Sequence, residues 1–271
     1  MLYKIYVLLN LGLLYLYLYI TPILYFFHKN MNIIRKKYFS NYLQWGNTVS
    51  KRIGFYNRVE IDDCEIDDTK NLIIMNHTSI IDNLIISKLF EKNNLNWNHI
   101  RTVSRISSRK IQNKTLELHD SLLINKNIQN DIKQLQEIRK KWSKKNDAQI
   151  ILFPEGIIYQ KSEYLKQKPF KILEKVYKYK NVLNPKNGIL NLIYHYFKKD
   201  IKNIYDITTV FLDNDNNRVY GELNILNHLA SKNLLVKVRV EKYDIDKLAD
   251  EKWIYNLWEK KDDWIKTQLQ L

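Results

Sequence analysis

Glycine and cysteine are both scarce in this chain of 271 residues. It contains 6 glycines, and none of them forms a glycine-rich loop of the kind that cradles nucleotide phosphates. The single cysteine, Cys64, excludes an intramolecular disulfide, which is in keeping with a reducing compartment. Carboxylates flank Cys64 on both sides and disfavour its thiolate, so we do not expect it to act as a nucleophile. No Cys/His cluster suggests a metal site, and we expect no bound metal.

Linkers rich in proline, glycine or serine are also absent, and we find no internal repeat. Hydrophobic residues make up 45% of the chain, which excludes intrinsic disorder of the whole chain and predicts one α/β domain with appendages. Lysine and arginine outnumber aspartate and glutamate by 44 to 29, giving a net charge of +15. Such a surface attracts phosphates of nucleic acids, anionic lipids or cofactors. Because aromatic–basic RNA motifs and Cys/His fingers are missing, we expect no nucleic-acid partner.

The longest apolar run extends from Ile5 to Phe27 and predicts a helix of about 34 Å, enough to cross the hydrocarbon core of a bilayer. Residues 1–30 are therefore predicted to form a transmembrane or membrane-embedded helix, and they lack a clear signal-peptide cleavage site. Basic residues are more frequent after this run than before it, which predicts a single-pass or monotopic anchor with the main body on the cytoplasmic side. The basic residues after the run are Lys29, Arg35, Lys36 and Lys37, and Lys4 precedes it.

Residues 31–56 are predicted to form a basic amphipathic helix. Apolar side chains recur at steps of three or four residues, while Arg35, Lys36, Lys51 and Arg52 lie off this stripe. Two interpretations are open: the helix lies on an anionic membrane surface, or it packs on the domain. The stripe consists of Ile34, Tyr38, Tyr42, Trp45, Val49 and Ile53.

Residues 57–245 alternate between short apolar runs and helical patterns, which predicts an α/β domain with a mixed, largely parallel sheet flanked by helices. Residues 246–271 are predicted to form a C-terminal helix, with its apolar pattern over 250–269. The predicted strands are Leu72–Met75, Ile100–Val103, Ser121–Ile124, Ile150–Phe153, Ile207–Phe211 and Leu234–Val240, and the predicted helices within the domain are Asp131–Trp142 and Gly188–Phe197.

A His-x4-Asp pattern joins His77 to Asp82 directly after the first predicted strand. Thr78 or Ser79 can cap a helix beginning near Ile80. If His77 lies in the strand-to-helix turn, it can fold back toward Asp82, and the carboxylate can then orient the imidazole and stabilise its charged form. The alternative is structural, because Ser79-x-x-Asp82 is also a capping-box pattern.

A second His-x4-Asp pattern occurs at His195 and Asp200. It lies inside a predicted continuous helix, where a separation of five residues points two side chains about 140° apart. We therefore interpret this second pair as structural.

Another motif, Phe153-Pro154-Glu155-Gly156, follows a predicted strand. Its position predicts that Glu155 lies beyond the carboxyl end of that strand, where sheets present ligands. A plain turn is the alternative, since proline and glycine favour turns.

With both motifs in this order, the chain resembles the glycerolipid acyltransferase family, which includes 1-acylglycerol-3-phosphate and lysocardiolipin acyltransferases. Residues 76–82 resemble its catalytic block and residues 153–156 its substrate-binding block. Val182-Leu-Asn-Pro-Lys186 and Trp258-Glu-Lys-Lys-Asp262 resemble the lysocardiolipin branch, so the resemblance spans residues 70–265. The chain departs from the family at Ile157, where threonine is usual, and at Leu123-Ile-Asn-Lys126, where lysine replaces arginine.

The resemblance implies a membrane-bound enzyme of phospholipid biosynthesis. His77 would be the general base that removes a proton from the free hydroxyl of a lysophospholipid such as lysophosphatidic acid, and Asp82 would orient it. The acyl donor would be acyl-coenzyme A, a substrate rather than a bound cofactor. The implied substrate-binding residues are Phe153, Pro154, Glu155, Gly156, Lys126 and Lys186. Three alternatives stay open: Ser79 as a nucleophile, a transacylase that takes acyl chains from phospholipids, and a non-catalytic basic scaffold at a membrane.

Overall fold

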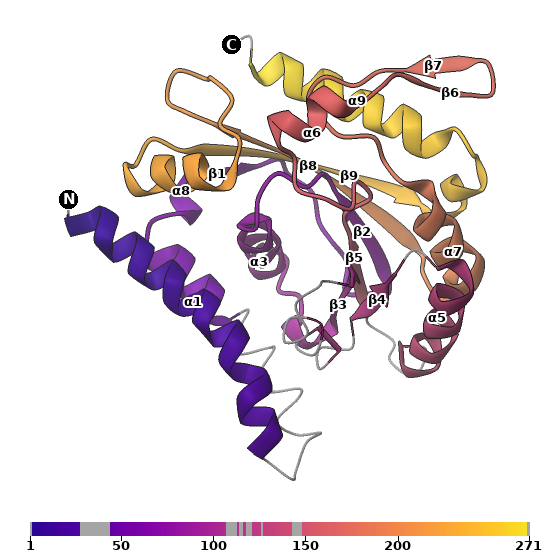
Figure 1. Cartoon of the computed structure of the whole chain (residues 1–271), viewed down its shortest axis with the longest axis horizontal. Helices are drawn as coiled ribbons and strands as arrows, with labels where there is room; N and C mark the ends of the chain where they lie inside the picture. The colour runs from indigo at the N-terminus through magenta and orange to yellow at the C-terminus, as the bar shows by residue number, and fades with distance from the viewer. Residues whose placement is uncertain are drawn as a thin grey trace.

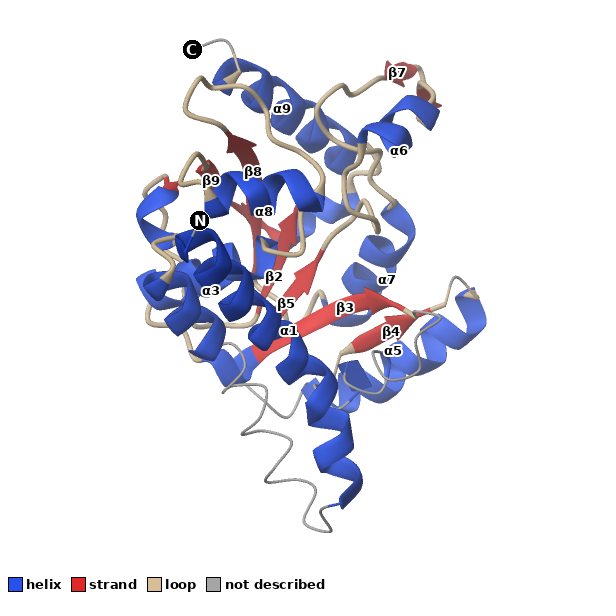
Figure 2. Ribbon diagram, turned by 60° about the vertical axis from the view of Figure 1, so that its left-hand side comes forward, coloured by secondary structure: helices blue, strands red, loops and turns tan. Residues whose placement is uncertain are grey.

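The apolar runs of the chain form the strands of a seven-stranded sheet in the order β1-β9-β8-β2-β5-β3-β4 (Figures 1 and 2). The computed structural model describes residues 2–27, 44–106, 113, 116–117, 121–125, 127–142 and 148–269, and it describes the backbone alone at residues 15, 17–19, 21–27 and 98. All neighbouring strands pair in parallel except β8 and β9, which pair antiparallel. The strands of this sheet are β1 Val59–Ile61, β2 Asn71–Met75, β3 Ile100–Arg105, β4 Leu122–Ile124, β5 Gln149–Leu152, β8 Asn203–Leu212 and β9 Leu235–Asp244.

Helices cover both faces of the sheet, and alternate side chains of each central strand serve the two layers (Figure 1). On β2, Ile73 and Met75 join a core shared with α1, α3 and α8, whereas Leu72 and Ile74 join a core shared with α5, α7 and α9. A separate hairpin of β6 Phe170–Ile172 and β7 Lys175–Tyr177 is antiparallel. The helices are α1 Leu2–Phe27, α3 Asp82–Lys92, α5 Ile128–Trp142, α6 Lys161–Lys166, α7 Asn187–Phe197, α8 Glu222–Ala230 and α9 Trp253–Gln268, and the short 3-10 turns are η1 Tyr56–Arg58, η2 Trp97–His99 and η3 Ile245–Ala249.

The predicted fold class, an α/β domain with a mixed and largely parallel sheet flanked by helices, is confirmed. Each predicted strand and helix of the domain has a counterpart, with bounds that differ by a few residues. Strands β1, β6 and β7 and helices α6 and α8 were not predicted. They are three to nine residues long, too short for a clear periodic pattern.

Helix α1 contains the run that was predicted to cross a membrane. Within the part of the chain that the structure describes, no helix combines the length and apolar character needed for a membrane span. Instead, α1 packs along α8 and buries Val7, Leu11 and Leu14 in the domain core. The basic residues that follow α1 fall outside what the structure describes.

The second part of the predicted amphipathic stripe packs on the domain. Residues 44–52 are helical, and Val49 and Ile53 are fully buried in the core shared with α1 and α3. Ile34, Tyr38 and Tyr42 lie outside the described residues. For the described half of the stripe, packing on the domain therefore accounts for the apolar pattern.

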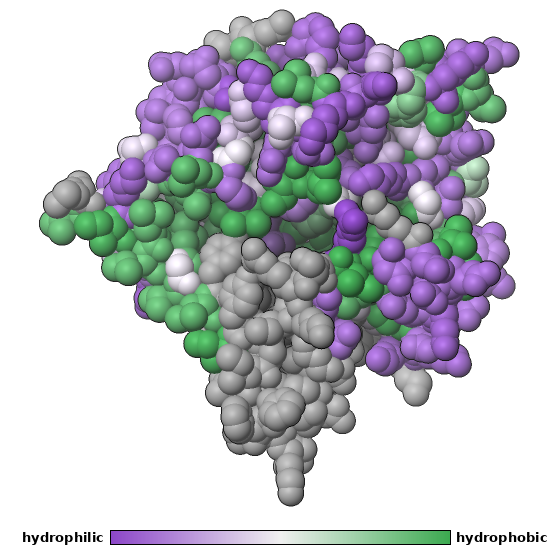
Figure 3. Space-filling model, viewed as in Figure 1, coloured by the Kyte–Doolittle hydropathy of each residue, from purple (hydrophilic) through white to green (hydrophobic). Residues whose placement is uncertain are grey.

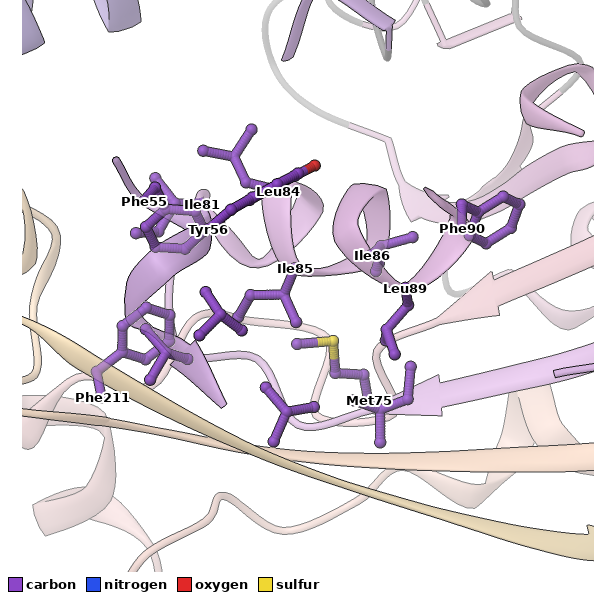
Figure 4. Packing of buried hydrophobic residues seen from close by; sticks show 14 of the residues in the cluster. Phe55, Tyr56, Met75, Ile81, Leu84, Ile85, Ile86, Leu89, Phe90 and Phe211 are labelled. Atoms are coloured by element: carbon purple, nitrogen blue, oxygen red, sulfur yellow. The ribbon is translucent and has the colours of Figure 1, made fainter. Parts of the chain in front are cut away.

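Helix α3 packs on the sheet where β2 ends. Its buried face includes Ile85 and Leu89, which point toward Met75 on β2 (Figure 4). Burial of such side chains contributes roughly 1.5–3 kcal/mol each. This packing fixes where the turn between β2 and α3 lies.

Candidate active site

Sheet register brings the two predicted motifs together. Strands β2 and β5 are parallel neighbours, with Ile73 opposite Ile151 and Ile74 opposite Leu152. The same offset of 78 residues, continued beyond the strand ends, places His77 opposite Glu155. Indeed, the His77 backbone N–H donates to Glu155 Oε2 at 3.2 Å. Both motifs thus lie at the carboxyl ends of adjacent parallel strands.

The imidazole of His77 is held by Asp82. His77 Nδ1 lies 2.9 Å from Asp82 Oδ2, and the Asp82 side chain is fully buried. A hydrogen bond at Nδ1 directs the ring and leaves Nε2 as the nitrogen available to a substrate. About 20% of the His77 side chain is exposed, so the ring can be reached from solvent.

Asp82 also accepts hydrogen bonds at the start of α3. The contacts of both the catalytic and the capping interpretation of the motif are therefore present in the structure. The oxygen that faces His77 accepts the backbone N–H groups of Thr78 at 2.8 Å and Ser79 at 3.0 Å. The helix was expected to begin near Ile80 with a Thr78 or Ser79 cap. It begins instead at Asp82, and Ile81 at the cap position makes no side-chain cap hydrogen bond. Asp82, in the first turn, caps the helix instead, because its side chain reaches back and accepts the preceding backbone N–H groups.

Phe153 and Tyr159 hold His77 from the side of β5. The rings of His77 and Phe153 stack with centroids 4.2 Å apart, and the Tyr159 backbone N–H donates to His77 O at 2.6 Å. Asn76, the residue before His77, is held by β8. Its side-chain amide forms two hydrogen bonds with the backbone of Thr209. The ring, backbone and preceding residue of His77 are therefore all fixed by neighbouring strands.

Glu155, which was predicted to bind the substrate, is buried beside the turn that carries His77. It is 1% exposed, and its second oxygen accepts the Leu183 backbone N–H and the Trp258 indole N–H, each at 3.3 Å. Burial raises the Glu155 pKa to about 7, while the hydrogen bonds and the nearby His77 oppose that rise. The geometry makes Glu155 a positioning residue for the His77 backbone.

The other predicted binding residues divide into two groups. Gly156 has φ +70°, and a side chain there would meet Lys186 Nζ at 3.1 Å, so Lys186 lies over the turn next to Glu155. The Lys186 backbone N–H also donates to Pro154 O at 2.9 Å, and Pro154 itself is buried. Lys126 lies outside the described residues, and so does most of the segment that leads to β4.

Helix α9 contacts the site through Glu155, on the side away from His77. The resemblance alone did not predict this contact. Trp258 contacts Glu155, and one turn later Lys261 forms a fully buried ion pair with Asp206 at 2.6 Å. Burial disfavours both charges, raising the pKa of Asp206 and lowering that of Lys261, and their pairing offsets part of this cost. The sequence signal was the Trp258-Glu-Lys-Lys-Asp262 motif, in which Trp258 and Lys261 are buried.

Ser79 and the second His-x4-Asp pair are placed differently from His77 and Asp82. Ser79 is fully buried and donates its hydroxyl to Glu222 at 2.6 Å, so it is not presented to a substrate as a nucleophile. His195 is exposed on α7, close to the start of β8 and hence at the opposite edge of the sheet from His77. Asp200 lies 3.5 Å from Arg139, and the two members of this second pair do not form a site.

Cys64 is a free thiol whose pKa is raised, mainly by burial, with Glu65 adding to the rise and Lys242 and Lys92 opposing it. The expected direction is confirmed, although the flanking carboxylates are not its main cause. A thiol with a raised pKa is a weak nucleophile at neutral pH.

Residues 52–211 match the model of the Acyltransferase family, and the match includes both motifs. No curated protein sequence matches the chain significantly. The fold is similar to the crystal structure of the 1-acyl-sn-glycerophosphate (LPA) acyltransferase PlsC from Thermotoga maritima, with a TM-score of 0.46 and 14% identity over 95% of this chain and 94% of that chain. Because the family model covers more than half of its residues, the chain belongs to the Acyltransferase family and is an acyltransferase.

Proposed function

We propose that the enzyme transfers a fatty acyl group from acyl-coenzyme A to the free hydroxyl of a lysophospholipid such as lysophosphatidic acid. The observation that carries this proposal is the His77–Asp82 pair, 2.9 Å apart at the carboxyl end of β2. Family membership supplies the reaction class, and the pair supplies a base that can act on a hydroxyl.

In the proposed mechanism, His77 Nε2 removes the proton from the acceptor hydroxyl as its oxygen attacks the thioester carbonyl. The new ester C–O bond forms and the C–S bond breaks. Coenzyme A leaves as a thiolate and recovers a proton from the imidazolium. Asp82 stabilises the imidazolium and holds its Nδ1–H, so no acyl-enzyme intermediate is needed.

Lys186 is the proposed contact for the acceptor phosphate. Its Nζ lies over Gly156, beside the turn that carries Glu155, and an ammonium group is a suitable point charge for a phosphate. Lys126 is a second candidate from the sequence. The net charge of +15 favours an anionic acceptor in general terms.

We further propose that α1 seats the enzyme on a membrane, with the catalytic domain on the cytoplasmic side. The buried residues Val7, Leu11 and Leu14 occupy one face of α1, and exposed apolar residues occupy a stripe about 180° away. Figure 3 shows hydrophobic residues gathered over α1. An exposed apolar stripe of this length is typical of a helix that lies in a membrane interface. The stripe consists of Leu2, Ile5, Leu9, Leu13, Leu16 and Ile20.

The reaction is tested with purified protein, labelled acyl-coenzyme A and a panel of lysophospholipids. We expect release of free coenzyme A in step with formation of labelled diacyl product. Acyl transfer that occurs only from a phospholipid donor would indicate a transacylase instead. No transfer from either donor to any acceptor would favour a non-catalytic scaffold.

A further inference from the structure

The turn that carries His77 is held by side chains along its whole length. The five consecutive backbone N–H groups of residues 77–81 each donate to a side-chain oxygen. Three of the four accepting residues are carboxylates from different parts of the chain. The acceptors, in chain order, are Glu155 for His77, Asp82 for Thr78 and Ser79, Glu222 for Ile80, and Ser79 Oγ for Ile81.

Glu222 is the member of this set that the sequence did not indicate. Its Oε1 accepts the Ile80 backbone N–H at 2.5 Å and the Ser79 hydroxyl at 2.6 Å, and its Oε2 lies 3.0 Å from the same hydroxyl. Glu222 is the first residue of α8 and follows Gly221, whose φ of +82° turns the chain into the helix. The side chain is half-buried, and burial is the main cause of its raised pKa.

The charge of Glu222 acts on both members of the catalytic pair. Asp82 raises the Glu222 pKa by repulsion between like charges, whereas His77 lowers it by attraction.

We infer that Glu222 is a positioning residue of the acyltransferase reaction, which holds the Ser79–Ile80 part of the turn between His77 and Asp82 through its hydrogen bonds. This inference rests on the proposed function for its catalytic part, because the reaction must use His77 as a base. A simple helix-start role for Glu222 is the competing explanation, since acidic residues favour the first turn of any helix.

Two substitutions separate these explanations. Glu222→Gln keeps the shape and one carbonyl oxygen but removes the charge, whereas Glu222→Leu removes the hydrogen bonds as well. Glu91→Gln is the matched control, because Glu91 lies near the other end of α3 and pairs with Lys51 on the surface.

We expect Glu222→Gln to lower kcat about tenfold with each KM changed less than twofold, since the position of the turn that carries His77 affects the transition state rather than substrate binding. Glu222→Leu should lower kcat by about 100-fold or more, and Glu91→Gln should match the wild type. If both Glu222 variants keep wild-type kcat, or if only KM changes, the catalytic part of the inference is overturned.

Amide hydrogen exchange of residues 77–81 tests the positioning part without any substrate. Exchange should be fastest in Glu222→Leu, intermediate in Glu222→Gln and unchanged in Glu91→Gln. Equal protection in all variants would overturn the positioning role. Because this readout does not need turnover, it separates failure of the inference from failure of the proposed function, which would show as a wild-type enzyme that transfers no acyl group.

Discussion

Asp82 Oδ2 lies 2.9 Å from His77 Nδ1 and also accepts the backbone N–H groups of Thr78 and Ser79. One oxygen thus starts a helix and orients an imidazole. The consequence is that a change at Asp82 affects both stability and catalysis, but to very different degrees.

Asp82→Asn should cost far more activity than stability. The amide keeps an oxygen for the turn N–H groups, so the loss of unfolding free energy should be on the order of 1 kcal/mol. A neutral side chain cannot stabilise the imidazolium and can fix the wrong tautomer, so kcat should fall by several orders of magnitude. Melting temperature and acyl-transfer rate are measured on the same preparation. A near-normal rate with a lowered melting temperature would reduce Asp82 to a helix cap.

Glu155 gives the fold a defined pH dependence. Its pKa of about 7 in the folded chain lies above the ordinary value of 4.5, so the folded state binds the proton more tightly than the unfolded state. The stabilisation this provides is fully present below about pH 4.5 and is lost as pH rises toward 7 and beyond. From pH 5 to pH 8, the unfolding free energy of the wild type should therefore fall relative to that of Glu155→Gln. Denaturant unfolding at both values measures it, and a pH-independent difference would contradict the assignment.

Trp258→Phe should weaken the support that α9 gives to the catalytic turn. The phenyl ring retains much of the packing but removes the indole N–H that Glu155 accepts. We expect kcat to fall about three- to tenfold, in line with a hydrogen bond to a partly charged group worth on the order of 1 kcal/mol. Trp253→Phe is the control, because Trp253 lies on the same helix but contacts Tyr243. Equal kcat values for the two variants would remove Trp258 from the support of the site.

Gly156→Ala tests the turn over which Lys186 lies. The left-handed φ of +70° costs an alanine about 1–2 kcal/mol, and its Cβ would push Lys186 Nζ away from a 3.1 Å contact. The variant should melt at a lower temperature and show a raised KM for a phosphate-bearing acceptor. Gly188→Ala, in open space on α7, should retain the wild-type KM. An unchanged KM in Gly156→Ala would separate Lys186 from acceptor binding.

Membrane binding through α1 should be hydrophobic and therefore insensitive to salt. Wild-type protein should remain on phospholipid vesicles through a high-salt wash. The double variant Leu9→Asp/Leu16→Asp should be released, because both side chains are about half exposed or more on the outer stripe and are not needed by the core. Vesicle co-sedimentation measures both, and removal of the wild type by salt alone would contradict the proposal.

Sequence patterns could predict the central strands because their apolar runs are buried on both faces and bounded by turn residues. The positions of His77 and Asp82 followed from the strand that ends just before them. The partnership of His77 with Glu155 could not be predicted, since it depends on the pairing register of β2 with β5, which local patterns do not contain. Glu222 was missed because 145 residues of chain separate it from His77 and its nine-residue helix carries little periodic signal.

The apolar run in α1 shows what hydropathy cannot predict. Its composition predicted a membrane helix, yet Val7, Leu11 and Leu14 are buried against the domain. Hydropathy alone does not reveal whether an apolar side chain meets lipid or protein, because both surroundings favour the same residues. Packing against α8 is what distinguishes the buried face of α1 from its exposed face.

Acyl transfer by His77→Ala, compared with His195→Ala, tests the central claim most directly. Both variants remove an imidazole from a His-x4-Asp pattern, but only His77 contacts its aspartate and faces the carboxyl end of the sheet. We predict that His77→Ala loses about 10²–10⁴-fold in kcat while its melting temperature stays near that of the wild type, and that His195→Ala retains full activity. Wild-type turnover in His77→Ala, or an equal loss in the two variants, would contradict the assignment of His77 as the general base.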